Sequence, residues 1–418
     1  MVLESGLHAG TQHAAPLPLA IPTTLHDALM ARLDRLHTAK EIAQVGATLG
    51  REFSYALLHA VSPLDEVTLQ QGLSQLVEAE LLYQRGLPPQ ARYVFKHALI
   101  QDAAYQSLLK STRQQYHSQI TQVLEEQFSE TVETQPELLA HHYTKAGLIA
   151  QAVPYWRQAG QRAVERSANA EAISHLTAAL ELLKTLPYTL ERTQQELLLQ
   201  MTLSLALIAT RGWADPEVER AYTRARELCG QVGETPQLFP VLFGIWNIHL
   251  VRGKGQTACE LGEQLLRLVQ SGQDPTLLLE AHFALGATLF WLGDLALARE
   301  HLEQGIALYD SQQHRALALL YGWDPGVACL TDAALTLWYL GYPDQALKTS
   351  HEALTLAWEL SHPFGLALAL DWAAMVHGLR REVQAAKERA EATIALSSEQ
   401  GVFVLLGTRD CPARLGTG

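Results

Sequence analysis

The chain has 418 residues, of which 48% are hydrophobic and 18% are charged, a composition that excludes a disordered or fibrous protein. Lys and Arg number 31 and Asp and Glu number 44, so the net charge of −13 disfavours nucleic acids and anionic membrane surfaces as partners. The four cysteines are widely spaced and form no CxxC pair, which argues against a zinc cluster or a disulfide framework and favours a cytoplasmic location.

Residues 1–22 contain Pro16, Pro18 and Pro22 and lack the basic start and continuous apolar core of a signal peptide. We predict that this segment is a linker or the remnant of a preceding region. The apolar runs, such as 201–209 and 365–370, fall far short of the roughly 20 residues that span a bilayer, so no membrane contact is predicted.

Residues 23–110 show a helical pattern followed by two β-prone runs. Leucines recur at spacings of four, four and three along 25–36, and further helices are predicted near 42–49, 54–60 and 66–81. The strings LLYQRG and ARYVF then flank LPPQ, which predicts a β-hairpin. Helices followed by a hairpin predict a winged-helix domain over 23–110.

The last of these helices, 66–81, is the one that would enter the DNA major groove. It carries Glu66, Glu78 and Glu80 and neither Lys nor Arg, whereas phosphate and base contacts require cations and amides. We therefore predict that the chain does not bind nucleic acid.

Beyond residue 110 nearly every segment has a helical pattern, and its punctuation repeats. Glycines end one helix and begin another at intervals of 40 and 48 residues, and an alanine follows each glycine five residues later: Gly253 and Ala258, Gly293 and Ala298, Gly341 and Ala346. Residues 345–364 also realign with 384–403 at a shift of 39. Such helix-turn-helix units stack because one unit cannot bury its own apolar face.

The segment 281–309 resembles a tetratricopeptide repeat, with Gly286, Gly293 and Ala298 in the family's places. We predict an all-α fold, a winged-helix module followed by a tetratricopeptide-like α-solenoid. Residues 111–190 are predicted as a helical linker with the first repeats, 191–400 as the repeats, and 401–418 as an irregular tail that suggests a truncated or frame-shifted gene. Most of the tryptophans of the repeats are expected to lie in the core: Trp246, Trp291, Trp338, Trp358 and Trp372.

The motifs of common enzymes are absent from the sequence. No GxxxxGK[ST] string, HExxH motif or GxSxG elbow occurs, and Gly253-Lys254-Gly255 is better explained as a turn between helices than as a phosphate site. The adjacent His141 and His142 point in different directions on a helix, which disfavours a metal site. Asp371, at the end of LALALD, is expected on a core helix. We predict no catalysis, no metal and no cofactor for this chain.

Three strings carry a family resemblance: IPTTLHDALMARLDRL (21–36), GREF (50–53) and YVFKHALIQDAAYQSLL (93–109). They resemble the region that follows the ATPase core in bacterial signal-transduction (STAND-type) ATPases, which include adenylate or guanylate cyclases fused to an AAA-like ATPase and a tetratricopeptide tail. The resemblance covers roughly residues 1–400, and 3–7 (LESGL) resembles the last piece of the ATPase part. It implies a C-terminal half whose missing part binds ATP or ADP.

The resemblance also implies one nucleotide-sensing candidate. The segment KHALIQD beginning at Lys96 resembles the Met-His-Asp motif of related ATPases, whose histidine contacts the β-phosphate of bound ADP; His97 matches that histidine, whereas Ala98 replaces the aspartate. The alternative is a histidine that is satisfied structurally at the start of a helix. A sensing role requires an ATPase domain in cis or in trans.

The sequence thus predicts a regulatory or scaffold part of a cyclase-associated signal-transduction ATPase, which binds a protein or peptide on the concave face of the solenoid. An alternative is part of a large ATP-dependent transcriptional activator that lacks its DNA-binding domain. That domain should be basic, and no basic cluster follows Arg389.

Overall fold

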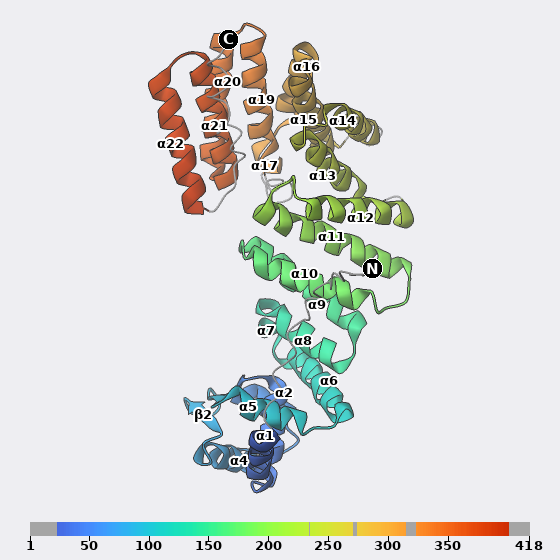
Figure 1. Ribbon diagram of the computed structural model, residues 1–418, viewed down its shortest axis with the longest axis vertical. Helices are drawn as coiled ribbons and strands as arrows, with labels where there is room; N and C mark the ends of the chain where they lie inside the picture. Colours follow the sequence, from blue (N-terminus) through green and yellow to red (C-terminus); the bar gives the residue numbers. More distant parts are fainter. Residues whose placement is uncertain (1–22, 234, 271–273, 315–322, 401–418) are drawn as a thin grey trace, which may run out of the picture. The chain divides into compact units, whose positions relative to one another are not determined.

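The computed structural model describes residues 23–233, 235–270, 274–314 and 323–400 (Figure 1). The chain divides into two compact units, Met1–Tyr155 and Trp156–Gly418, and the boundary falls within helix α9 (Ile149–Glu165). The predicted linker at 1–22, with its ATPase-like string, and the predicted tail at 401–418 lie outside the described residues.

The first unit begins with four helices, among which one strand is inserted, and a hairpin. The elements are α1 (Thr23–Asp34), α2 (Thr38–Leu49), β1 (Glu52–Ser54), α3 (Tyr55–Val61), α4 (Glu66–Glu78), β2 (Leu82–Arg85) and β3 (Arg92–Phe95). The strands form an antiparallel sheet in the order β1–β3–β2. This order of helices and strands is that of a winged-helix module, and the predicted hairpin is confirmed. Strand β1 was not predicted, because three residues are too few for an alternating pattern.

Close approaches between elements fix the winged-helix core. A side chain at Gly46 of α2 would collide with the ring of Phe53 on β1, and one at Gly72 of α4 would collide with Ile42. Glycine at these two positions allows α2 to lie directly against the sheet and against α4. Asp65 caps α4 by accepting a hydrogen bond from the Thr68 N–H at 3.0 Å.

Packing in the first unit continues past residue 110, where the sequence predicted the module to end. Helices α5 (Ala98–Gln106), α6 (Lys110–Gln127), α7 (Ser129–Thr134) and α8 (Pro136–Ala146) follow the hairpin. Helix α6 contacts α2 and α3 on one side and α8 on the other. The helices after residue 110 therefore extend the winged-helix core before the repeats begin.

The second unit consists of stacked helix pairs, as predicted (Figure 1). After α9 the elements are α10 (Asn169–Leu183), α11 (Leu190–Arg211), α12 (Pro216–Val232), α13 (Leu238–Val251), α14 (Gly255–Gln270), α15 (Pro275–Leu292), α16 (Leu295–Leu308), the short α17 (Ser311–His314), α19 (Pro325–Tyr339), α20 (Pro343–Leu360), α21 (Pro363–Leu379) and α22 (Val383–Gln400). The first helices of successive pairs touch, since α15 contacts both α13 and α19, and α19 contacts α21. The all-α solenoid is confirmed.

The predicted punctuation of the repeats is also confirmed. Gly253, Gly293 and Gly341 have φ of 70°, 88° and 89°, a left-handed conformation that glycine adopts without steric cost and that turns the chain between the helices of a pair. The alanines that follow them are fully buried where the two helices meet. In the last pair Arg381 takes the position of the glycine, with φ of 62°.

One core extends across several helix pairs of the second unit. It includes residues from α11, α12, α13, α14, α15, α16 and α19, among them the fully buried Trp246. Trp323, which precedes α19, packs on Phe243 of α13, on Phe283 of α15 and on Trp213 of the α11–α12 turn, with ring centroids 5.7–6.2 Å apart. Contacts in this core therefore reach beyond adjacent pairs.

Helix α15 is long and apolar enough to cross a membrane by length and composition, whereas the sequence analysis found only shorter apolar runs. It is the one such helix among the described residues, and 56% of its 18-residue apolar window is buried within the protein. Its position in the core of the helix pairs accounts for its apolar character.

Candidate functional site

His97, the predicted nucleotide sensor, lies between β3 and α5 with its side chain exposed. It occupies the N-cap position of α5 in an extended conformation, but its ring makes no capping hydrogen bond. The neighbouring Lys96 pairs with Glu80 at 3.4 Å and lies over the ring of Tyr83. The ring is therefore not satisfied by capping α5, and it is free to contact a group outside the described chain.

The exposed face of α4 carries the charges that the sequence predicted. Glu66 and Glu78 are exposed, together with Gln70, Gln71 and Gln75, and the helix has no cation. Such a face offers amides but no positive charge to a phosphate backbone. The prediction that the chain does not bind nucleic acid stays a prediction, and this geometry supports it.

The adjacent histidines of α8 differ in burial, since His142 is buried and His141 is exposed, but both rings lie near the ring of His117 on α6, with centroids 5.0 and 6.2 Å away. His142 Nδ1 lies 2.8 Å from Nδ1 of His117 on α6, whose Nε2 lies 3.0 Å from the hydroxyl of Tyr105 on α5. Burial lowers the pKa of His117 to about 4 and that of His142 to about 3. Both rings are thus neutral at physiological pH, and they join α5, α6 and α8. Among the described residues no group of three or more side chains is placed to hold a metal ion.

Three carboxyl groups on the first helices of the repeats are buried: Glu280 on α15, Asp332 on α19 and Asp371 on α21. Burial raises the pKa of Glu280 well above its usual range, that of Asp332 to about 7 and that of Asp371 to about 6. Both carboxyl oxygens of Glu280 lack a hydrogen-bond partner among the residues that the structure describes. Asp371 lies on a core helix, as predicted, and Glu280 is held as the neutral acid.

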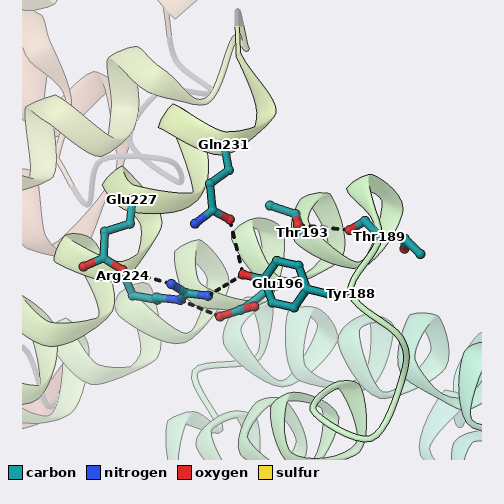
Figure 2. Close-up of polar contacts among 7 residues, drawn as sticks. All are labelled: Tyr188, Thr189, Thr193, Glu196, Arg224, Glu227 and Gln231. Atoms are coloured by element: carbon teal, nitrogen blue, oxygen red, sulfur yellow. Dashed lines mark hydrogen bonds and ion pairs between the residues drawn. The ribbon is translucent and has the colours of Figure 1, made fainter.

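A polar network holds the α11–α12 pair together (Figure 2). The guanidinium of Arg224 on α12 donates to Glu196 of α11 at 2.7 Å, to Glu227 at 2.9 Å and to the hydroxyl of Tyr188 at 3.4 Å. The Tyr188 hydroxyl in turn donates to Gln231 at 3.3 Å. Because the carboxylates of Glu196 and Glu227 both pair with Arg224, its positive charge is not available to a ligand, and we assign this network a structural role.

Replacement of Arg224 by methionine is expected to lower the free energy of unfolding of the second unit by about 2 kcal/mol, because Glu196, only 14% exposed at its side chain, loses its partner. Arg299 is the control, since its pair with Glu303 on the same helix is more exposed and contributes about 0.5 kcal/mol or less. Urea unfolding followed by tryptophan fluorescence measures both, because all eight tryptophans lie at residue 156 or later. If replacing Arg299 by methionine lowers the free energy of unfolding as much as replacing Arg224 does, the network around Arg224 does not hold α11 to α12.

The sequence predicted that the tryptophans of the repeats lie mostly in the core, but two of them are largely exposed. Trp246 is fully buried, but Trp291 on α15 is 65% exposed and Trp358 on α20 is 60% exposed. Trp291 belongs to an aromatic group in which Phe290 contacts Trp291, Tyr339 and Trp372, with ring centroids 5.2, 6.0 and 6.3 Å apart. We call these four residues the aromatic edge. Phe290, Trp291 and Tyr339 lie at the carboxyl ends of α15 and α19, whereas Trp372 lies near the middle of α21.

The central first helices expose little surface to a partner. Every residue of 241–248 in α13, 283–288 in α15 and 331–337 in α19 is buried. Two shallow depressions lie along α16 and α20, each lined by residues of a single helix. The prediction of binding on the concave face stays a prediction, and the aromatic edge contributes two exposed aromatic side chains, Trp291 and Tyr339, to the surface of the described repeats.

The fold and these surfaces define a tetratricopeptide-like helical-repeat protein with an N-terminal winged-helix module. No family model matches the chain. An uncharacterized protein of Rhizobium meliloti (strain 1021) is 26% identical over 347 residues, which are 82% of this chain. The chain spans about a third of the length of that relative.

Three solved structures show weak similarity at low sequence identity. A Signal Transduction ATPase with Numerous Domains with a tetratricopeptide repeat sensor, from Pyrococcus horikoshii, has a TM-score of 0.43 and 10% identity, covering 87% of this chain and 64% of its own. A Rap protein complexed with Competence and Sporulation Factor has a TM-score of 0.45 and 10% identity, and the match covers 90% of this chain and 93% of the Rap chain. NprR in complex with its cognate peptide NprX has a TM-score of 0.45 and 14% identity, and the match covers 86% of this chain and 95% of the NprR chain.

Proposed function

We propose that this chain is the regulatory, partner-binding part of a longer cytoplasmic signal-transduction ATPase and has no catalysis of its own. The observation that carries the proposal is the combination of a winged-helix module, whose His97 is exposed, with helical repeats that expose the aromatic edge. Helical repeats provide extended surfaces for proteins and peptides. The much greater length of the relative is consistent with a larger parent protein.

In this proposal the repeats bind a protein or peptide, and the winged-helix module passes that event to an ATPase domain in cis or in trans. The exposed ring of His97 would contact the bound nucleotide of that domain. The α4 face, which lacks cations, supports a protein partner over DNA. The resemblance stated above further implies a cyclase as the output of the parent protein, and we include that association in the proposal.

The first experiment examines the longer relative. We expect the sequence of the Rhizobium meliloti relative outside the matched stretch to contain a P-loop, GxxxxGK[ST]. The purified ATPase region is then assayed with and without this chain, and a change in ATP hydrolysis on addition of the chain is expected. Hydrolysis of ATP by the isolated chain, cyclase turnover by it, or no effect on the ATPase region would contradict the proposal.

The role of His97 needs its own measurement. In a protein that joins this chain to its ATPase region, His97→Ala is expected to reduce the ADP that copurifies, because one contact to the nucleotide is lost. His59→Ala, at another exposed histidine of the same module, is the control. Unchanged ADP content in the His97 variant would leave His97 without a sensing role.

A further inference from the structure

The aromatic edge is the centre of a longer apolar surface on the second unit. Further exposed apolar side chains lie in or beside the turns between the two helices of three consecutive pairs: Leu292 at the end of α15, Leu297 in the first turn of α16, Tyr342 between α19 and α20, and Val383 at the start of α22. Tyr339 is 57% exposed and Val383 is 75% exposed. Contiguous exposed apolar patches of this kind mark interaction sites, whereas single exposed apolar residues need no explanation.

The apolar side chains recur at the spacing of the helix pairs. Helices α15, α19 and α21 contact one another in that order, and packed helices lie about 8–10 Å apart. An α-helix rises about 10.5 Å over seven residues, so apolar residues one heptad apart on a bound helix would meet successive pairs. The spacing therefore fits an amphipathic helix that runs across the three turns.

The charged groups along this surface are mostly paired with one another. Arg299 pairs with Glu303, and Arg380 pairs with both Glu382 and Asp344. Two exposed groups have no ion-pair partner within the described ranges: Asp294 in the α15–α16 turn and Arg381 in the α21–α22 turn. One end of the surface thus carries a carboxylate that caps α16 but has no ion pair among the described residues, and the other end carries a guanidinium that likewise has no ion pair there.

We infer that this surface docks an amphipathic helix of a protein partner, with the amino terminus of that helix at Asp294 and its carboxyl terminus at Arg381. The helix dipole is positive at the amino end and negative at the carboxyl end, so this orientation complements both free charges. The opposite orientation places like charges together at both ends. The inference rests on the proposed function and specifies the surface and the class of partner.

The test uses a synthetic helical peptide of about 15 residues, long enough to cross three turns. It carries leucines at heptad spacing, one lysine in its first turn and one glutamate in its last. A second peptide exchanges the lysine and the glutamate. Because the second peptide is the better helix former in isolation, stronger binding of the first cannot arise from helicity. Fluorescence anisotropy is expected to show micromolar binding of the first peptide and weaker binding of the second.

Variants of the full chain assign the binding to this surface. The double variant Trp291→Ser with Tyr339→Ser is expected to bind the first peptide about tenfold more weakly. Trp358→Ser removes an equally exposed tryptophan from α20, outside this surface, and is expected to change binding little. Asp294→Asn with Arg381→Gln is expected to abolish the preference between the two peptides; asparagine keeps the N-cap of α16 that Asp294 provides.

We call the double variant Trp291→Ser with Tyr339→Ser the edge variant. The inference would be overturned if the wild-type chain bound both peptides equally, or if the Trp358 variant and the edge variant lost equal affinity for the first peptide. A shift from dimer to monomer in the edge variant would also overturn it, since the occupant would then be a second copy of the chain. If the edge variant still alters the ATPase region as the wild type does, the inference is wrong and the proposed function stands. If the wild type binds the first peptide but leaves the ATPase unchanged, only the proposed function is wrong.

Discussion

Replacement of Trp323 by alanine is expected to lower the free energy of unfolding of the second unit by about 3–5 kcal/mol. The indole is 7% exposed and contacts aromatic rings from three other parts of the repeats, so its loss leaves a cavity that no single helix can fill by moving. Tryptophan fluorescence during urea unfolding measures the effect, because seven of the eight tryptophans remain in the variant.

Trp323→Phe is the matched control. It keeps an aromatic ring in the same place and removes the indole N–H, which has no hydrogen-bond partner within the described part of the chain. Deleting an unpaired buried donor offsets part of the lost contact area, so a cost of about 1 kcal/mol is expected. If the alanine variant loses no more free energy of unfolding than the phenylalanine variant, Trp323 does not join these helices.

Acidification from pH 7 to pH 4 is expected to destabilise the first unit by roughly 3 kcal/mol or more through the His117–His142 pair, whose two rings titrate together. The folded state holds their pKa values at about 4 and about 3, below the value near 6.5 of the free side chain. At pH values between the folded pKa values and about 6.5, the unfolded chain binds more protons than the folded chain. The free energy of unfolding therefore decreases as the pH falls below about 6.5.

The cause of the low pKa values is burial first and neighbouring charge second. Burial penalises the imidazolium form of both rings, and His141, Lys145 and Arg113 add repulsion at His117. A proton on both Nδ1 atoms would also break their 2.8 Å contact. We expect the helices of this cluster, α5, α6 and α8, to loosen first.

Hydrogen exchange of the α6 and α8 amides, corrected for the intrinsic rate at each pH, follows this loss. His142→Gln removes one titrating ring but keeps an amide that can hydrogen-bond to His117, and is expected to weaken the pH dependence by about half. His59→Gln, at an exposed position, should leave it unchanged. A pH profile that is the same in the His142 variant as in the wild type would assign the acid sensitivity to other groups.

The overall architecture was predictable because it depends on periodic features. The leucine spacing of α1, the glycines of the repeat turns and the strings around Pro88–Pro89 each determine local backbone structure, and the structure contains the corresponding elements. Strand β1 was missed because its stability comes from pairing with β3, a partner 40 residues away in sequence, rather than from its own three residues.

The candidate surfaces were less predictable, since they depend on which face of each helix is covered. Trp246 and Trp291 both lie in apolar helical segments, yet one is at the centre of the core and the other is exposed at the end of α15. The contact between His117 and His142 joins α6 to α8, and no local pattern links them. The exposure of His97 follows from its place in the connection between β3 and α5.

The core that extends from α11 to α19 limits which repeats this protein can gain or lose in evolution. In an ordinary solenoid each repeat contacts only its neighbours, so repeats can be gained or lost as units. Here Trp323 reaches α15, α13 and the turn before α12, so removing one of the intervening pairs would also destroy contacts of pairs that remain. The segment from α11 to α19 is therefore expected to unfold cooperatively and to be inherited as one block. The buried residues of α21 pack in two smaller clusters with residues of α15, α16, α19 and α20, so α21 is tied to this block as well.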